Sequence, residues 1–291
     1  MRRVQTERPR HVYLSLRNPF PAIQEFATQV LPQITAPFVL ISGSEDVTLP
    51  NQVDQRWRPF SDAEKDTIFS ILHHEHLIHW FAENLDEKFG ERVSGLPLGM
   101  VYPNSRVEDV TALPFGRKLC ERHQRVLCGH RTREGPQWDI RREVTVRAET
   151  VWAAFSTVTK DEVNERDFLD LMRSHAFVLC VEGGGLDPSP KAWQCLEQGA
   201  IPIVRRTAAT EPYQALPVAF VDSWEDDAIS AKKLEQWRAE FSVWFDDPYY
   251  RHELRRRLSL DYWWKNVTAI AASQGKRLSG PAVESKNSDS Y

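Results

Sequence analysis

The feature that most constrains the fold of this 291-residue chain is the recurrence of short apolar runs between segments of helical periodicity. Continuous apolar runs, such as residues 38–41 (FVLI) and 177–181 (FVLCV), are typical of parallel strands buried on both faces. The helical segments carry end signals: Ser61 begins one with capping-box spacing to Glu64, and Gly199 closes another. Strand, helix and strand in short cycles predict βαβ units and an α/β fold with parallel sheets.

The cycles fall into two groups, which predicts two domains. The expected strands are residues 11–16, 38–41, 92–98, 125–128, 177–181, 201–204 and 218–221. The pattern breaks between about residues 105 and 125 and becomes helical from Trp224 onward. We therefore predict an N-terminal α/β domain over 1–115, a second domain over 116–250, a terminal helical segment of one or two helices over 251–274 and a flexible tail over 275–291.

Charge and hydropathy exclude several protein classes. The chain has 37 Lys and Arg against 41 Asp and Glu, a net charge of −4, whereas dedicated nucleic-acid binders are usually basic. No apolar run approaches the roughly 18 residues of a membrane helix, and the N-terminus lacks the apolar stretch of a signal peptide. The four cysteines form no C-x-x-C pair. We expect a cytoplasmic protein with reduced thiols, no nucleic-acid partner, no integral membrane segment and no bound metal.

The strongest candidate for a binding site is the glycine-rich segment that follows the apolar run 177–181. Gly183, Gly184 and Gly185 permit a tight turn, and a helix is expected to begin at Ser189, with Lys191 in its first turn. A helix start after a parallel strand offers free N–H groups and a positive dipole end to a phosphate. A cation in the first turn opposes the dipole, and a bound diphosphate would remove that conflict. The alternative is a glycine-rich turn with no ligand.

A second candidate is the basic segment after the strand expected at 125–128. Arg131 and Arg133 lie nearest the end of that strand, and Arg141 and Arg142 follow downstream. Arginine forks can clamp phosphates with two hydrogen bonds each. The alternative is a solvated basic loop that pairs with local acids.

A third candidate is the acidic pair Glu45 and Asp46, which follows the strand expected at 38–41. A carboxylate at the end of a buried strand can act as a general base if partial burial tunes its pKa. The alternative is an acidic residue that caps a turn. The histidine cluster over 73–79 lacks the H-E-x-x-H spacing of a zinc site, and we read it as a solvated helix end with one packed histidine.

Several of these segments resemble the GT-B glycosyltransferases, in particular small exostosin-like members. The segments that carry the resemblance are 182–187 (EGGGLD), 191–193, 199–204 (GAIPIV), 213–218 and Trp224 in the second half, with 38–50, 79–84 and 96–99 in the first. The resemblance spans about residues 12–265. It implies two Rossmann-like domains that face each other across a cleft, with C-terminal helices that cross back onto the first domain.

The resemblance also implies a reaction and its participants. The chain would move a hexosyl or pentosyl group from a nucleotide-sugar donor, held by the second domain, to a hydroxyl of an oligosaccharide or other glycan acceptor. Transfer would be inverting and metal-independent. No cofactor is implied, because the nucleotide sugar is a co-substrate and the nucleoside diphosphate a product.

Site residues carry over by position. The resemblance implies donor binding by Arg131, Arg133, Glu182, Gly183, Gly184, Gly185, Ser189, Lys191 and Gln194. Gln194 stands where the family commonly has a ribose-binding glutamate, and Lys191 where an arginine is frequent. Asp46 is the candidate base for the acceptor hydroxyl. Two other hypotheses stay open: an epimerase-like enzyme that uses nucleotide sugars, and a non-catalytic module that binds nucleotides or glycans.

Overall fold

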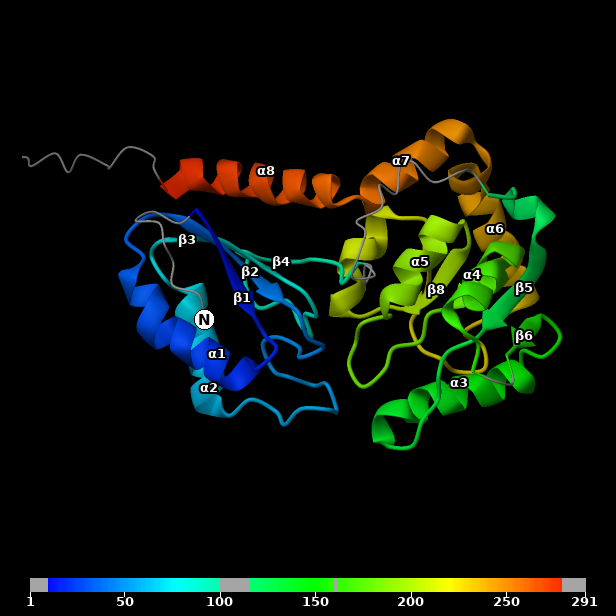
Figure 1. The fold of residues 1–291 in the computed structure, drawn as a ribbon, viewed down its shortest axis with the longest axis horizontal. Coiled ribbons are helices and arrows are strands. Elements are labelled where there is room, and N and C mark those ends of the chain that lie inside the picture. The colour runs from blue at the N-terminus through cyan, green and yellow to red at the C-terminus, as the bar shows by residue number, and fades with distance from the viewer. Residues whose placement is uncertain (1–9, 100–115, 160–161, 279–291) are drawn as a thin grey trace, which may run out of the picture.

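The chain folds into two parallel-sheet domains that lie side by side, joined by a long terminal helix (Figure 1). The structure, a computed structural model, describes residues 10–99, 116–159 and 162–278. It confirms the predicted fold class, an α/β protein of GT-B type with two Rossmann-like domains and C-terminal helices that cross back. The predicted domain limits at 115 and 116 fall at the edge of a stretch outside the described residues, so that boundary stays a prediction.

The N-terminal sheet has the strand order β1-β2-β3-β4, with all neighbours parallel. Its elements are β1 (His11–Ser15), α1 (Pro19–Glu25), β2 (Phe38–Gly43), α2 (Asp62–Leu72), β3 (Leu77–Ala82) and β4 (Val93–Gly95). Side chains alternate across a strand. Leu40 and Trp80 therefore share one buried cluster with α1 and α2, while Val39 and Phe81 point to the other face.

The structure confirms the interpretation of the histidine cluster as a solvated helix end with one packed histidine. Helix α2 ends at Leu72 and the next residue, His73, is exposed, whereas the packed histidine, His79, lies inside β3. His79 is buried, and its Nε2 lies 2.8 Å from Ser94 Oγ. This polar contact explains how a histidine is accommodated in a buried strand.

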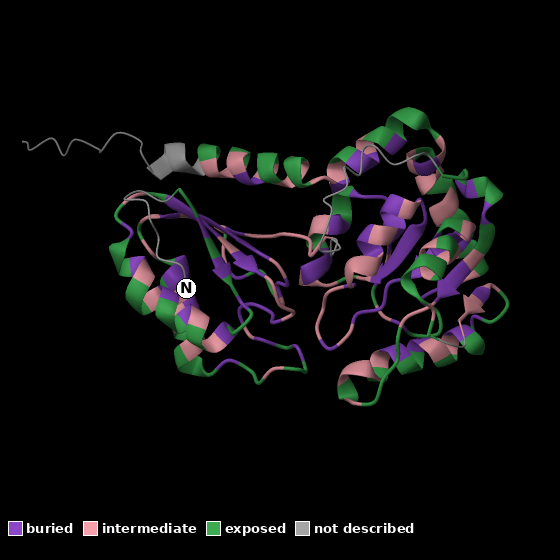
Figure 2. Cartoon of the chain, in the orientation of Figure 1, coloured by how far each residue is buried: buried purple, intermediate pink, exposed green. Residues whose placement is uncertain are grey.

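The C-terminal sheet has the order β6-β5-β7-β8-β9, again all parallel. Its strands are β5 (His123–Cys128), β6 (Ser156–Val158), β7 (His175–Leu179), β8 (Ile201–Arg205) and β9 (Ala219–Val221), and its helices are α3 (Asp139–Glu149), α4 (Glu165–Ser174), α5 (Pro190–Gln198) and α6 (Ala231–Asp246). Every residue of β7 is buried, as expected for a parallel strand covered on both faces (Figure 2).

The order of this second sheet reverses next to β5. The chain runs from β5 outward to β6, returns to the other side of β5 as β7, and continues through β8 to β9. In open parallel sheets, ligands bind in the crevice at the carboxyl ends of the strands where the order reverses. The fold therefore places the loops after β5 and β7 at the position where parallel sheets of this kind bind ligands.

The terminal helices connect the two domains. Helix α7 (Pro248–Leu258) packs on the C-terminal domain, and α8 (Leu260–Leu278) crosses to the open face of the N-terminal sheet (Figure 1). There Val267 forms a buried cluster with Val39 and Phe81.

The terminal segment contains two helices that meet at Ser259, within the expected one or two, and α8 continues to Leu278. The rest of the predicted tail, 279–291, lies outside the described residues. Within the described ranges, every helix is too short or too polar to cross a lipid bilayer. Cys128, Cys180 and Cys195 are buried free thiols, and Cys120 is an exposed one.

Candidate active site

A pocket of about 570 Å³ opens at the point where the order of the C-terminal sheet reverses. Its walls are the loops after β5 and β6 and the start of α5, which follows β7. Of the residues predicted to bind a donor, those that line this pocket are Arg131, Arg133, Ser189, Lys191 and Gln194. The topology thus brings together side chains that lie far apart in the sequence.

Lys191 is the cation at the centre of this arrangement. It lies in the first turn of α5, where the hydroxyl of the N-cap Ser189 accepts from the Lys191 N–H at 3.4 Å. Burial, and then the charge of Arg141, lower the pKa of Lys191 to about 8. None of the ion pairs among the described residues includes Lys191. A partly desolvated cation without a carboxylate partner, at a helix N-terminus, is a position that an anion would stabilise.

Arg141 is a second buried cation of the pocket. It lies on α3, its Nε donates to the carbonyl oxygen of Glu182 at 3.0 Å, and its guanidinium stacks over the Trp138 ring at 4.8 Å. Burial lowers its pKa. Arg131 and Arg133, which lie closer to the end of the strand, were the favoured phosphate ligands from the sequence. The spacing of Arg141 with Val144 and Ala148 nevertheless places all three on the buried face of α3.

The two favoured arginines are more exposed than Arg141. Arg131 Nε pairs with Glu162 Oε1 at 2.6 Å, and both side chains are about 60% exposed (60% and 63%). Exposed ion pairs contribute little to stability, so Arg131 can exchange this partner for a phosphate at small cost. Arg133 also lines the pocket, and its guanidinium lies 6.0 Å from the Trp138 ring.

His130 also lines the pocket and is not among the site residues predicted from the sequence. Its Nε2 lies 2.9 Å from the carbonyl oxygen of Arg141, and burial, with the charge of Lys191, lowers its pKa to about 3. A carbonyl only accepts, so Nε2 carries the proton and Nδ1 presents a lone pair. No described residue forms a hydrogen bond with this buried Nδ1. The neutral ring therefore holds a buried acceptor without a hydrogen-bond partner among the described residues.

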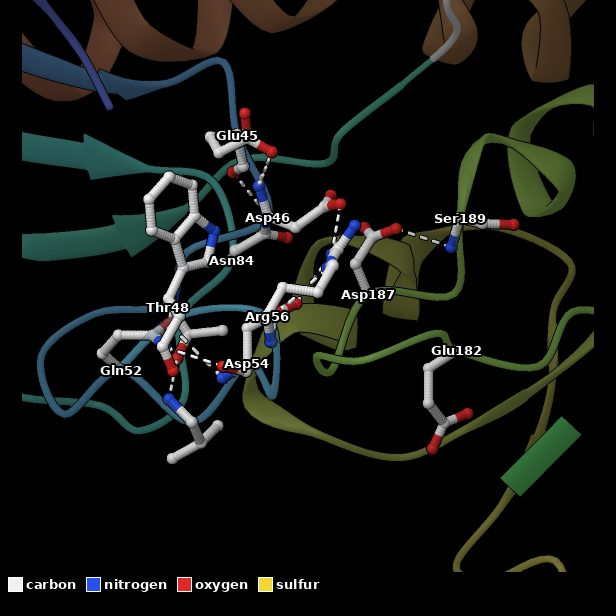
Figure 3. A network of polar contacts seen from close by, with 12 residues as sticks. Glu45, Asp46, Thr48, Gln52, Asp54, Arg56, Asn84, Glu182, Asp187 and Ser189 are labelled. Carbon is white, nitrogen blue, oxygen red and sulfur yellow. Dashed lines mark hydrogen bonds and ion pairs between the residues drawn. The ribbon is translucent and has the colours of Figure 1, made fainter. Parts of the chain in front are cut away.

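Glu182 and the three glycines do not line this pocket. The Glu182 carboxylate is buried; one oxygen pairs with Arg205, and the other accepts from Trp224 Nε1 at 2.9 Å. Its side chain is drawn in Figure 3. Both carboxylate oxygens are therefore engaged within the domain core, and the predicted contact of Glu182 with a donor stays a prediction.

Gly183, Gly184 and Gly185 lie against side chains of the protein itself. A Cβ on Gly185 would lie 2.7 Å from Asp54 Oδ2, and one on Gly184 would lie 3.2 Å from Asp54 Oδ1. The Gln55 N–H donates to the carbonyl of Gly184 at 3.0 Å, which ties the two domains together. In this structure, Gly184 and Gly185 allow a loop of the N-terminal domain to approach closely, and Gly183 lies at ordinary contact distance from Arg141.

Asp46 lies at the same junction, outside the pocket. Arg56 pairs with both Asp46 and Asp54, and Asp187 faces them from the C-terminal domain (Figure 3). Burial raises the pKa of Asp187 to about 7, and the charges of Asp46 and Glu83 add to the effect. The fold thus gathers acidic side chains from both domains at one boundary, with Arg56 between them.

Comparisons with known proteins add a likeness of fold. Neither a scan of protein-family models nor a search of curated proteins finds a match for this sequence. A chain in the crystal structure of a GtfA/B complex is similar at 12% identity and a TM-score of 0.34, over 88% of this chain and 54% of that one. This chain thus spans about half the length of that chain (54%).

Two structures of the spinosyn rhamnosyltransferase SpnG are also similar. The complex with thymidine diphosphate matches at 13% identity and a TM-score of 0.37, over 90% of this chain and 71% of that one. The complex with spinosyn aglycone matches at 12% identity and a TM-score of 0.35, over 92% and 73%. All of these TM-scores lie below 0.5, so the function of this chain has to rest on its own residues.

Proposed function

We propose that this chain is a glycosyltransferase that moves a sugar from a nucleotide-sugar donor to an acceptor hydroxyl. The observation that supports this most directly is Lys191, a partly desolvated cation without a carboxylate partner among the described residues, at the start of a helix and beside Arg141. A diphosphate in this pocket would neutralise the lysine and accept from the free N–H groups of α5.

The pocket supplies groups for each part of a donor. Lys191, Arg131 and Arg133 would stabilise the charge that develops on the departing diphosphate. Gln194, whose side-chain amide both donates and accepts, offers hydrogen bonds to donor hydroxyls. The acceptor oxygen attacks the anomeric carbon from the opposite face, which inverts the centre. The cations of the chain would supply the charge stabilisation in a metal-independent transfer.

Asp46 is the candidate base for the acceptor hydroxyl, and its carboxylate forms an ion pair with Arg56. A carboxylate held by a guanidinium is a weaker proton acceptor. The variant Asp46→Asn tests this role: transfer at the wild-type rate would show that the base lies elsewhere.

The experiment that tests the function is a thermal-shift screen against UDP, TDP, GDP and their sugar conjugates, followed by transfer assays with the donor found. A bound ligand raises the apparent stability by mass action. In the variant Lys191→Ala, the shift should shrink and turnover should fall about 10²–10³-fold, as for the loss of one charge-stabilising donor. Lys232→Ala removes an exposed lysine outside the pocket and serves as the control. Equal nucleotide shifts in Lys191→Ala and the wild type would refute the proposal.

A further inference from the structure

A second pocket, of about 360 Å³, lies where both domains and α8 meet. Trp193 of the C-terminal domain, Trp263 and Trp264 of α8, and Leu96 and Leu98 of the N-terminal domain all contribute to its walls. The ring centroids of Trp193 and Trp263 are 6.3 Å apart. Indole and leucine side chains from three parts of the fold thus form one apolar chamber.

This chamber adjoins the first pocket through α5. Lys191 lines the first pocket and Trp193 the second, so the same helix forms a wall of each. The two pockets are linked at the start of α5, because Glu83 lines the second pocket and its charge helps to raise the pKa of Asp187, which accepts from the N–H of the N-cap Ser189 at 2.5 Å. Transfer would require the reacting ends of the two ligands to meet beside this helix start.

The side chains of the walls are mostly apolar. Glu83 is the only charged side chain among the described residues that line the chamber, and the Trp263 Nε1 already donates to the Arg257 carbonyl at 3.0 Å. A hydroxyl that is buried without a hydrogen bond weakens binding, because it loses its hydrogen bonds to water. An oligosaccharide would bury several such hydroxyls here, whereas an apolar alcohol or phenol has one. The chemistry of the walls therefore favours the apolar compound.

Glu83 is placed to meet that single hydroxyl. It follows β3 at the carboxyl end of the sheet, and its Oε2 accepts from the Ser44 N–H at 2.9 Å. No hydrogen bond between described residues reaches its Oε1, and Glu83 takes part in none of their ion pairs. Burial raises the pKa of Glu83, and the charge of nearby Asp46 adds to this, so the carboxylate has an increased affinity for a proton.

We propose that this chamber holds the acceptor of the transfer reaction proposed above, that the acceptor is an apolar alcohol or phenol, and that Glu83 receives its hydroxyl proton. This departs from the glycan acceptor that the family resemblance implies. As the O–H bond breaks, the proton goes to Glu83, and the oxygen forms a bond to the anomeric carbon. The bond from that carbon to the diphosphate breaks, and its electron pair leaves with the nucleoside diphosphate.

The binding arm of the test needs no donor. Isothermal titration of the full chain with 2-naphthol should show binding, and titration with maltotriose should not. Trp264→Ala, which removes a half-exposed indole of the chamber (44% exposed), should weaken 2-naphthol binding at least tenfold. Tyr249→Ala removes an exposed ring outside the chamber and should change nothing. Equal affinity in Trp264→Ala and the wild type, or tighter binding of maltotriose, would overturn the assignment.

The catalytic arm uses the donor from the nucleotide screen. Glu83→Gln should bind 2-naphthol within twofold of the wild type and lose about 10²–10⁴-fold in transfer rate, the usual contribution of a general base. Glu83→Asp should recover part of the rate. Unchanged transfer by Glu83→Gln would remove Glu83 from the reaction.

The two proposals fail in different ways. If nucleoside diphosphates bind in a Lys191-dependent manner and 2-naphthol does not bind, the transferase proposal stands and the acceptor inference falls. If 2-naphthol binds and no nucleotide does, both the transferase proposal and the acceptor role of the chamber fall.

Discussion

Lys191 and Trp193 are separated by a single residue on α5, yet they face different cavities, the lysine the pocket of the C-terminal domain and the tryptophan the chamber between the domains. With 3.6 residues per turn, positions two apart point to opposite sides of a helix. One short helix therefore presents a cation to one substrate and an indole to the other. In the reaction proposed above, the two ligands would have to reach each other around the start of this helix.

The affinity for nucleoside diphosphates should depend on the protonation of Lys191. The pKa of this lysine is lowered to about 8, so the charged form dominates below that pH and declines above it. Nucleoside diphosphate binding, measured by isothermal titration, should therefore weaken about tenfold between about pH 7 and pH 9. Lys191→Arg stays charged over this range and should give a flat profile. The same slope in Lys191→Met would assign the effect to another group.

Replacement of Glu182 should lower the free energy of unfolding, because its carboxylate is engaged within the domain and not with a ligand. Glu182→Ala leaves Arg205 without its buried counter-ion and Trp224 Nε1 without its acceptor, a loss of about 3–5 kcal/mol in the free energy of unfolding. Urea unfolding measures this directly. The control, Glu162→Ala, breaks the exposed pair with Arg131 and should cost less than about 1 kcal/mol. A fully stable Glu182→Ala protein with weakened donor binding would instead support the donor contact that the family resemblance implies.

The contact between the domains can be tested by substitution of Gly185, with the same substitution at Gly183 as the control. Gly185→Ala places a methyl group 2.7 Å from Asp54 Oδ2, whose carboxylate is fixed by Arg56, whereas Gly183→Ala makes an ordinary 3.5 Å contact with Arg141. Overpacking of this kind costs about 1–3 kcal/mol, and here the loops can relieve it by moving apart. Small-angle scattering should show a larger radius of gyration for Gly185→Ala only. Identical scattering and stability of both variants would contradict the observed contact.

Asp187 should make the stability fall as the pH rises. Its pKa is raised to about 7 in the folded state, so between about pH 4 and pH 7 the folded protein holds a proton that the unfolded chain releases. The free energy of unfolding therefore decreases through this window and stays lower above it. Asp187→Asn should be more stable than the wild type above pH 7 by on the order of 1–2 kcal/mol, after allowance for partial exposure, and nearly equal below pH 4.

Thermal unfolding across this pH range measures the difference. Asp66→Asn, at an exposed position on α2, should show no such trend. A stability difference between Asp187→Asn and the wild type that does not change with pH would rule out a proton on Asp187 as the cause.

The sequence patterns predicted β2 and β7 from uninterrupted apolar runs and β1 from a less regular one. β3 was missed because His79 interrupts its apolar run and because this run follows a helical segment directly. α3 was missed because its sequence is mostly charged and its N-cap, Trp138, makes no side-chain capping bond. An element whose burial depends on residues far away in the sequence cannot be predicted from its local pattern alone.

The site was predictable in the same uneven way. The position of Lys191 and Ser189 follows from a local signal, a strand followed by glycines and a helix start. The role of Arg141 depends on how α3 packs, and the placement of Glu83 depends on β3 pairing with β2, so neither follows from its neighbours in the sequence. The tryptophans of the chamber come together only because α8 returns to the first domain.

That return has a mechanical consequence. Trp263 packs against the core of the C-terminal domain, and its Nε1 donates to the carbonyl oxygen of Arg257 at 3.0 Å. Val267, about one turn further along α8, is buried against the sheet of the N-terminal domain. Any rotation of one domain against the other would therefore have to bend or displace α8 between these two residues.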